Sequence, residues 1–180
     1  QVTKSALVIG GGVAGMEAAI GVAEQGFQAF LVEKTNTLGG VAKRLRSTWR
    51  GEKISEYVQG LVERVKNHPG IQLFLETEVK ETSGILGNFT STLVPQNGKG
   101  SPVNVDHGAT ILATGGQEYR PSEYLYGKHP GVWTHLDLDD AVLRGDERVK
   151  KAQTAVFIQC VGSRIPERPY CSKICCTHSL

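Results

Sequence analysis

The feature that most constrains the fold is a glycine pattern near the start of the chain, within SALVIGGGVAGMEAAIGVAEQGFQAFLVEK at residues 5–34. A short apolar run, ALVI, leads into Gly10, Gly12 and Gly15, which form a G-x-G-x-x-G motif. A second apolar run, AFLVE, ends on Glu33, about 20 residues after the glycines. Strand, glycine turn, helix, strand and acid in this order are typical of a βαβ unit that binds a dinucleotide.

Each of these residue types has a physical role at its position. Gly10 permits a tight turn, and Gly12 has no side chain, so a pyrophosphate can approach the backbone. Gly15 and Ala19 let the helix lie close to the strand. The N-terminus of that helix presents unpaired N–H groups to phosphates, and Glu33 accepts hydrogen bonds from ribose hydroxyls. The alternative interpretation is a glycine-rich turn without a ligand.

A second glycine turn favours FAD over NAD as the dinucleotide. The stretch TLGG places Gly39 and Gly40 shortly after Glu33, and FAD domains often place such a pair near the flavin's phosphates. A third turn ends the apolar strand ATILATGG at residues 109–116. We therefore expect FAD as cofactor. The residues expected to bind it are Gly10, Gly12, Gly15, Glu33, Lys34, Gly39, Gly40, Ala113, Thr114 and Gly115.

A second helix is predicted over residues 53–67, because large side chains recur there at helical spacing. The HPG sequence at 68–70 ends that helix. The residues expected on its packed face are Ile54, Tyr57, Val58, Leu61, Val62 and Val65.

The rest of the pattern predicts an α/β fold. A strand is expected at 71–76, and two strand-like pieces at 88–94 and 102–108 flank a turn at 96–100. We therefore expect a Rossmann-like FAD-binding domain over residues 1–145, with a central parallel sheet and a small antiparallel insert at about 77–107. Residues 146–180 are expected to hold a linker and the start of a second dinucleotide-binding-like domain, which contains the cysteine motif.

The segment that follows the third glycine turn is expected to be an ordered loop over 117–134. Thr134 and Asp137 resemble a capping box, with Asp in the usual place of Glu, that opens a short helix. The polar run at 144–153 indicates a linker with a solvated surface. The stretch TAVFIQ at 154–159 is then expected to form the first strand of the second domain.

All four cysteines follow this expected strand, in the order Cys160, Cys171, Cys175 and Cys176. Cys160 occupies the place where a second phosphate-binding glycine turn would begin, so we expect no NAD(P)H site in this chain. Four interpretations of the cysteines remain open: structural disulfides, a zinc site, a redox-active pair at Cys175 and Cys176, and an iron–sulfur cluster. Cys171 and Cys175 are spaced to share one helical turn.

Composition excludes several classes of function. The net charge of +2 is too small to indicate nucleic acid or an anionic membrane. The sequence has no 18-residue apolar run and no signal peptide, so we expect a cytoplasmic protein. Because the chain begins with Gln1 and ends within the cysteine motif, we also expect a fragment of a longer polypeptide. Four histidines lie beside turns and are expected to be exposed: His68, His107, His129 and His135.

Four segments together give the chain a family resemblance: VIGGGVAGMEAA, LVEK with LGG, ILATGGQEYRPSEYLYG, and FIQCVGSR with YCSKICC. They resemble the A-subunit family of heterodisulfide reductase and its bacterial homologues, over nearly the whole chain. The resemblance implies FAD and one [4Fe–4S] cluster, whose ligands would be Cys160, Cys171, Cys175 and Cys176. The family's further cysteines after the GG turn are missing here, so at most one four-cysteine cluster fits.

The same resemblance implies an electron-transfer oxidoreductase component. Its partners would be the other subunits of a heterodisulfide-reductase-like complex and ferredoxin or another electron carrier. No acid–base or nucleophile constellation stands out, so no catalytic side chain is assigned and the chemistry would be that of the cofactors. Two alternatives remain open at this point: a flavin-dependent thiol–disulfide oxidoreductase and a zinc-stabilised nucleotide-binding interaction module.

Overall fold

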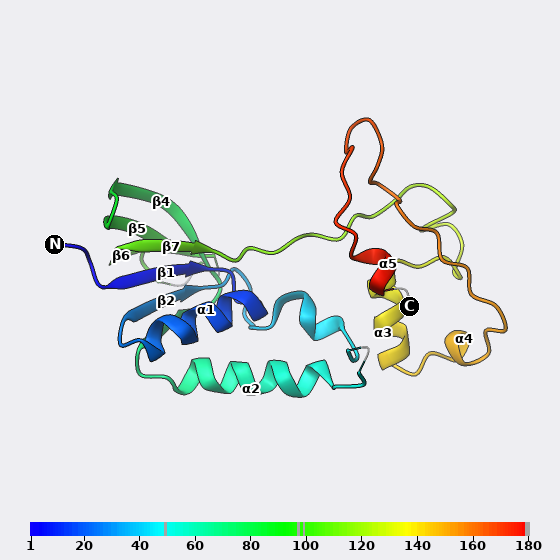
Figure 1. Cartoon of the computed structure of the whole chain (residues 1–180), viewed down its shortest axis with the longest axis horizontal. Coiled ribbons are helices and arrows are strands. Elements are labelled where there is room, and N and C mark those ends of the chain that lie inside the picture. Colours follow the sequence, from blue (N-terminus) through cyan, green and yellow to red (C-terminus); the bar gives the residue numbers. More distant parts are fainter. Residues whose placement is uncertain (49, 97, 99, 179–180) are drawn as a thin grey trace. The chain divides into compact units, whose positions relative to one another are not determined.

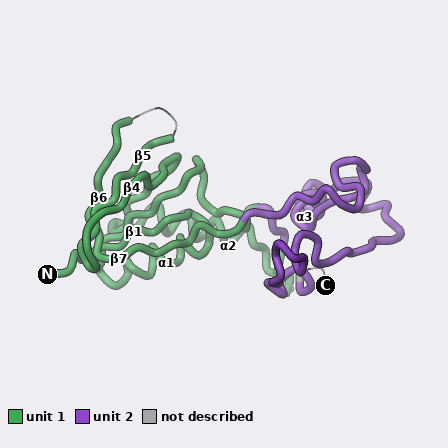
Figure 2. The backbone as a smooth tube through the Cα atoms, turned by 90° about the horizontal axis from the view of Figure 1, so that it is seen from above, with its two compact units in different colours: residues 1–43, 47–116 green, residues 44–46, 117–180 purple. Residues whose placement is uncertain are grey.

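The computed structural model describes the chain except for residues 49, 97, 99, 179 and 180. It contains two compact units. The first comprises residues 1–43 and 47–116, and the second comprises residues 44–46 and 117–180 (Figure 2). The domain boundary expected near residue 145 stays a prediction.

A four-stranded parallel sheet forms the centre of the first unit. Its strands are β1 (Ser5–Ile9), β2 (Gln28–Val32), β3 (Ile71–Phe74) and β7 (Ala109–Leu112), in the order β3-β2-β1-β7. All three pairings are parallel. Parallel sheets need cover on both faces, and the first unit supplies a helical layer on one face and an antiparallel sheet on the other. The Rossmann-like α/β class is therefore confirmed.

Two helices cover one face of the parallel sheet, α1 (Val13–Glu24) and α2 (Ile54–Asn67) (Figure 1). Their buried side chains share one core with the inward-facing residues of β1 and β2. The face predicted for α2 is largely correct, because Val58, Leu61 and Val65 are buried. Tyr57 is the exception. It is half exposed, and its hydroxyl donates a 2.6 Å hydrogen bond to Glu17 Oε1, so its polar end stays in solvent beside α1.

The antiparallel insert consists of β4 (Thr77–Ile85), β5 (Asn88–Pro95) and β6 (Val103–His107), in that order across the sheet. Leu93 and Val105 from the insert are buried with Leu7 and Val32 of the parallel sheet. The insert therefore covers the face opposite the helices, and the small antiparallel sheet is confirmed. The turn expected at 96–100 lies partly outside the described residues.

The described residues of the second unit form three short helices, α3 (His135–Leu143), α4 (Glu147–Lys150) and α5 (Cys175–His178). The capping box is confirmed: Thr134 Oγ1 accepts from the Asp137 N–H, and an Asp137 carboxylate oxygen accepts from the Thr134 N–H. The linker expected at 144–153 is only partly irregular, because Asp146 caps α4 by accepting from the Arg148 N–H at 2.9 Å.

A network of charged side chains orders the loop at 117–134. Arg44 is the last residue of the short 3-10 helix η1 (Gly40–Arg44). Its Nη2 lies 2.6 Å from Asp140 Oδ2, while Arg120 pairs with Asp137 and with Glu118, each at 3.0 Å. These pairs join Arg44, the loop and α3 within the second unit.

One expected strand is wrong. Residues 154–159 form no strand, and their apolar side chains are exposed, with 80% of Val156 accessible. A strand is stabilised by hydrogen bonds to a neighbouring strand, and no described strand forms a β-ladder with this segment. The segment has a strand-like sequence, but the pairing partner that would convert it into a strand is missing among the described residues.

Within the part of the chain that the structure covers, no helix has both the length and the apolar character needed to cross a bilayer.

Candidate functional site

The glycine turns predicted from the sequence meet at one edge of the parallel sheet. The Ala113 N–H donates a 2.8 Å hydrogen bond to the Ile9 carbonyl, which holds the end of β7 beside the end of β1. The Gly39 N–H donates a 2.8 Å bond to the Gly11 carbonyl, and Gly12 and Gly39 form an isolated parallel bridge. Since parallel strands end at the same edge, the three turns form one continuous backbone surface there.

Three glycines of the first turn have different physical reasons for being glycine. Gly10 has a φ of +111°, and a Cβ there would collide with the Ala113 carbonyl oxygen. A Cβ at Gly15 would collide with the carbonyl oxygen of Gly10, so Gly15 allows α1 to lie against the turn. A Cβ at Gly12 would have no neighbour within 4 Å. Gly12 therefore faces open space at the N-terminus of α1, where a phosphate could approach the backbone.

The carboxylate of Glu33 lies beside this turn and is bound by the protein itself. Oε2 accepts from the Gly11 N–H at 2.7 Å, and Oε1 accepts from the Thr35 N–H at 2.8 Å. Burial alone would raise the pKa of Glu33, but the hydrogen bonds from Thr35 and Gly11 and the charge of Lys34 outweigh burial and lower that pKa. A carboxylate has about four acceptor sites, so these bonds leave capacity for a ribose hydroxyl.

The remaining predicted cofactor residues lie around the same edge. Gly40 is adjacent to Gly12, because a Cβ at Gly40 would come within 3.1 Å of the Gly12 Cα. Thr114 and Gly115 are exposed just after β7, and Lys34 is exposed just after β2. The structure therefore gathers the ends of β1, β2 and β7, with the Gly39–Gly40 turn, into one candidate site for a dinucleotide.

The four cysteines differ in exposure and in local backbone structure. Cys160 and Cys171 are half-buried thiols outside any disulfide, whereas Cys175 and Cys176 lie exposed in α5. Among the described residues, no three or more His, Cys, Asp or Glu side chains form a group suited to a metal ion. A common cluster site for the four cysteines therefore stays a prediction.

The expected helical turn between Cys171 and Cys175 is wrong. Helix α5 begins only at Cys175, and Lys173 has a left-handed φ of +59°, which interrupts helical geometry. The Lys173 N–H instead donates to the Cys171 sulfur at 3.3 Å in a local turn. Cys160 also has a positive φ, +63°, so the motif contains backbone geometry that is uncommon for non-glycine residues at Cys160 as well as at Lys173.

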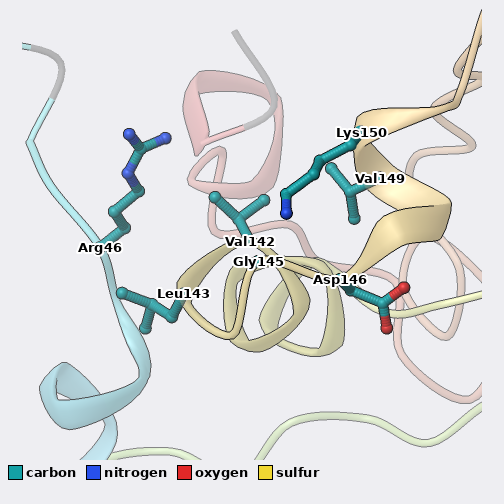
Figure 3. Close-up of a pocket in the computed structure, with 7 residues that line it drawn as sticks. All are labelled: Arg46, Val142, Leu143, Gly145, Asp146, Val149 and Lys150. Carbon is teal, nitrogen blue, oxygen red and sulfur yellow. The ribbon is translucent and has the colours of Figure 1, made fainter.

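A cavity of about 380 Å³ in the second unit is lined by none of the residues predicted to bind cofactor or metal (Figure 3). Its polar lining is already paired in part, because Lys150 binds Glu147 at 2.9 Å and Asp146 binds Arg148 at 2.6 Å. None of its lining side chains carries a group that the sequence predicts to take part in chemistry. We therefore place the candidate functional site at the glycine turns of the first unit.

Sequence reasoning missed the polar centre of the insert. The prediction that His107 is exposed is wrong: it is fully buried, and its Nε2 lies 2.8 Å from Ser91 Oγ, which is itself 2.7 Å from Thr82 Oγ1. Its Nδ1 lies 3.1 Å from the Ala109 carbonyl, so Nδ1 carries the hydrogen and Nε2 accepts. The alternation of Val105 and His107 along β6 was a usable signal for this burial.

Comparisons with known proteins agree with this geometry. The family model described as pyridine nucleotide-disulphide oxidoreductase matches residues 4–161. An iron-sulfur A subunit of CoB–CoM heterodisulfide reductase from Methanopyrus kandleri is 29% identical, over 98% of this chain and 40% of its own length. The A subunit of the H(2):CoB-CoM heterodisulfide,ferredoxin reductase from Methanothermobacter marburgensis is 27% identical, over 99% of this chain and 40% of its own length.

The solved structure of L-proline dehydrogenase from P. horikoshii is similar in fold. It has a TM-score of 0.53 and 23% sequence identity, over 62% of this chain and 22% of that one. The similarity supports the Rossmann-like architecture of the first unit. The chain spans about 40% of the length of the two curated reductase relatives.

Proposed function

Since the chain belongs to the pyridine nucleotide-disulphide oxidoreductase family, we propose that it is the FAD-binding part of an electron-transfer protein similar to the A subunit of heterodisulfide reductase. An FAD-dependent oxidoreductase is the activity class of the chain. The finer assignment adds one [4Fe–4S] cluster on the terminal cysteines. It also places the chain between an electron donor, ferredoxin and a partner that reduces a disulfide.

The observation that carries this proposal is the meeting of the glycine turns at one sheet edge. The bonds from Gly39 to Gly11 and from Ala113 to Ile9 hold the turns together through the backbone alone. The open side of Gly12 provides the space that a pyrophosphate would need. Glu33 is already oriented at this edge by Gly11 and Thr35. The chain's own residues would therefore bind and orient the ADP half of FAD, and FAD would supply the electron-transfer chemistry.

The cysteine motif supports the cluster by its donor chemistry. Four soft thiolate donors in one short segment suit iron–sulfur iron. Because the described cysteines do not form a metal-binding group, binding one cluster would require the segment between Cys160 and Cys176 to change conformation. Arg164, Arg168 and Lys173 lie within that segment. Their positive charges would partly offset the negative charge of a cluster with four thiolates.

Partner proteins belong to the same proposal. The relatives' names include a CoB–CoM heterodisulfide reductase and an H(2):CoB-CoM heterodisulfide,ferredoxin reductase. For this chain we infer the same classes of partner, a ferredoxin-like electron carrier and a disulfide-reducing protein.

Anaerobic purification with flavin and metal analysis tests the proposal. We expect one FAD per chain after reconstitution and about four irons, with a broad absorbance band beyond that of the flavin. Flavin without iron, together with a cysteine pair that cycles with flavin reduction, would instead identify a thiol–disulfide oxidoreductase. Stoichiometric zinc in a protein that binds no flavin would identify an interaction module and contradict the proposal.

A further inference from the structure

Lys43 is a cation at the candidate dinucleotide site that neither the glycine motif nor the family match assigns. It lies on η1, shortly after the second glycine turn. A Cβ at Gly39 would come within 2.8 Å of Lys43 Cγ and 3.1 Å of Lys43 Cδ. Gly39 therefore leaves room for the stem of Lys43, and this stem lies against a residue that is bridged to Gly12.

The amine of Lys43 is oriented by a short hydrogen-bonded loop. Nζ donates to Thr37 Oγ1 at 2.6 Å. Thr35 Oγ1 lies 2.9 Å from the Thr37 carbonyl and 2.8 Å from Glu33 Oε1. The loop between β2 and the second glycine turn is thus hydrogen-bonded to the Glu33 carboxylate through Thr35 and to the Lys43 amine through Thr37. An ammonium group has three donors, so two remain after the bond to Thr37.

The local charge balance favours an anionic ligand near this amine. The motif from Gly10 to Gly15 contains no charged side chain. Glu33 is held in its ionised form, which repels a phosphate, and the adjacent Lys34 offsets that charge. No described acidic side chain forms an ion pair with Lys43. A pyrophosphate that bridges two nucleosides carries two negative charges, and the backbone N–H groups at the start of α1 supply only partial positive charge.

We propose that Lys43 is the side-chain cation that binds the pyrophosphate of the dinucleotide at the glycine turns. The inference rests on the proposed function and adds a residue to it. The Lys43 ammonium would pair with a phosphate oxygen, as lysines commonly do in phosphate sites. The hydrogen bond to Thr37 would fix the direction in which the ammonium points. In this arrangement, the absence of a side chain at Gly39 leaves room for the Lys43 stem. The absence of a side chain at Gly12 leaves room for the phosphate.

ADP binding by titration calorimetry tests this role, because ADP carries the pyrophosphate without the flavin. In buffer of about 0.01 M ionic strength, where the screening length is about 30 Å, Lys43→Gln should weaken ADP and FAD binding roughly tenfold. Lys43→Arg should recover most of the loss, because Arg keeps the charge. The matched control is Lys66→Gln, which removes the same charge from an exposed position on α2. It should leave ADP binding unchanged.

Salt separates a phosphate contact from a structural role. The difference between wild type and Lys43→Gln should shrink at about 0.5 M salt, because screening weakens an exposed charge pair. Equal ADP affinity for the Lys43→Gln and Lys66→Gln proteins would overturn the inference, and so would a loss that Arg does not recover and salt does not change. If wild type binds neither ADP nor FAD, the proposed function itself fails. If wild type binds both and Lys43→Gln is unaffected, only the role of Lys43 fails.

Discussion

The Gly11 backbone N–H donates a 2.7 Å hydrogen bond to Oε2 of Glu33, and this bond joins the first glycine turn to the end of β2. The second residue of the G-x-G-x-x-G motif thus orients the acid that the motif is expected to place near a ribose. A Cβ at Gly11 would come within 2.9 Å of the Glu33 Cβ. The close contact between Gly11 and Glu33 therefore requires a glycine at position 11, in addition to the three glycines of the motif.

Replacing Glu33 by Gln should destabilise the first unit by about 1 to 2 kcal/mol at neutral pH, because a charged acceptor of two backbone N–H groups is lost. The pKa of Glu33 is lowered in the folded chain. Its contribution should therefore be complete above the ordinary Glu pKa of about 4.3 and be lost as the pH falls through the lowered folded value. Urea unfolding of wild type and variant at several pH values measures this. A stability difference that stays constant down to about pH 2 would contradict it.

His107 should make the stability of the insert depend on pH in a range closer to neutral. Burial lowers the pKa of His107, although its bond to Ala109 and the charge of Asp106 act to raise it. The unfolded chain then binds a proton more readily than the folded chain, so stability should fall as the pH drops below about 6.5, the ordinary His pKa. Unfolding of wild type between about pH 7.5 and pH 5 gives the slope.

The control for His107 is a His107→Gln variant, for which the slope of the unfolding free energy against pH is compared with that of wild type. The absolute stability of the variant does not enter this comparison. Gln does not titrate, so the part of the slope between about pH 6.5 and pH 5 that comes from this residue should vanish. Identical slopes for wild type and His107→Gln would show that His107 does not titrate differently in the folded chain.

The cap of α3 offers a test within the second unit. Thr134→Ala removes the bond to the Asp137 N–H at 3.1 Å and should destabilise this unit by about 1 kcal/mol. Thr134→Ser retains the hydroxyl and should stay within a few tenths of a kcal/mol of wild type. Circular dichroism during urea unfolding is the measurement. Equal losses for Ala and Ser would show that the hydroxyl does not cap the helix.

The cluster prediction concerns all four cysteines as one set. After anaerobic reconstitution, Cys160→Ala or Cys171→Ala should remove most of the roughly four irons per chain, because the proposed cluster needs all four thiolates as ligands. Ser172→Ala, a neighbour of Cys171 without a thiol, should keep the iron. Iron analysis and EPR of the reduced protein distinguish the variants. Full iron content in the Cys160→Ala protein would remove Cys160 from the ligand set.

Local sequence patterns predicted most of the first unit. The glycine turn, the packed face of α2 and the three strand ends each depend on residues close together in the chain, where spacing decides the geometry. The predictions that failed concern features that depend on pairing between residues far apart in the sequence. Residues 154–159 have a strand-like sequence, but no described strand pairs with them. The burial of His107 depends on the register of β6 against β5, which places it opposite Phe89.

In the candidate site, too, the features set by local spacing could be predicted and those set by long-range contacts could not. Gly10, Gly12 and Gly15 could be predicted with their roles, because the motif relates spacing to geometry. The position of Lys43 depends on how η1 folds back over Gly39, which no short-range pattern specifies. The arrangement of the four cysteines likewise depends on contacts across the segment from Cys160 to Cys176. Sequence therefore predicts the donor atoms of that motif but not their distances.

FAD binding by Gly12→Val is the measurement that tests the central claim most directly. The matched control is Gly21→Val on α1, the helix that Gly12 caps, because a Cβ at either glycine has no neighbour within 4 Å and therefore causes no collision within the protein. If the pyrophosphate lies at the open side of Gly12, Gly12→Val should weaken FAD and ADP binding at least 100-fold, about 3 kcal/mol, while Gly21→Val binds as wild type does. Both variants should keep the circular dichroism spectrum of the folded chain. Wild-type FAD affinity in the folded Gly12→Val protein would contradict the placement of the dinucleotide at this edge of the sheet.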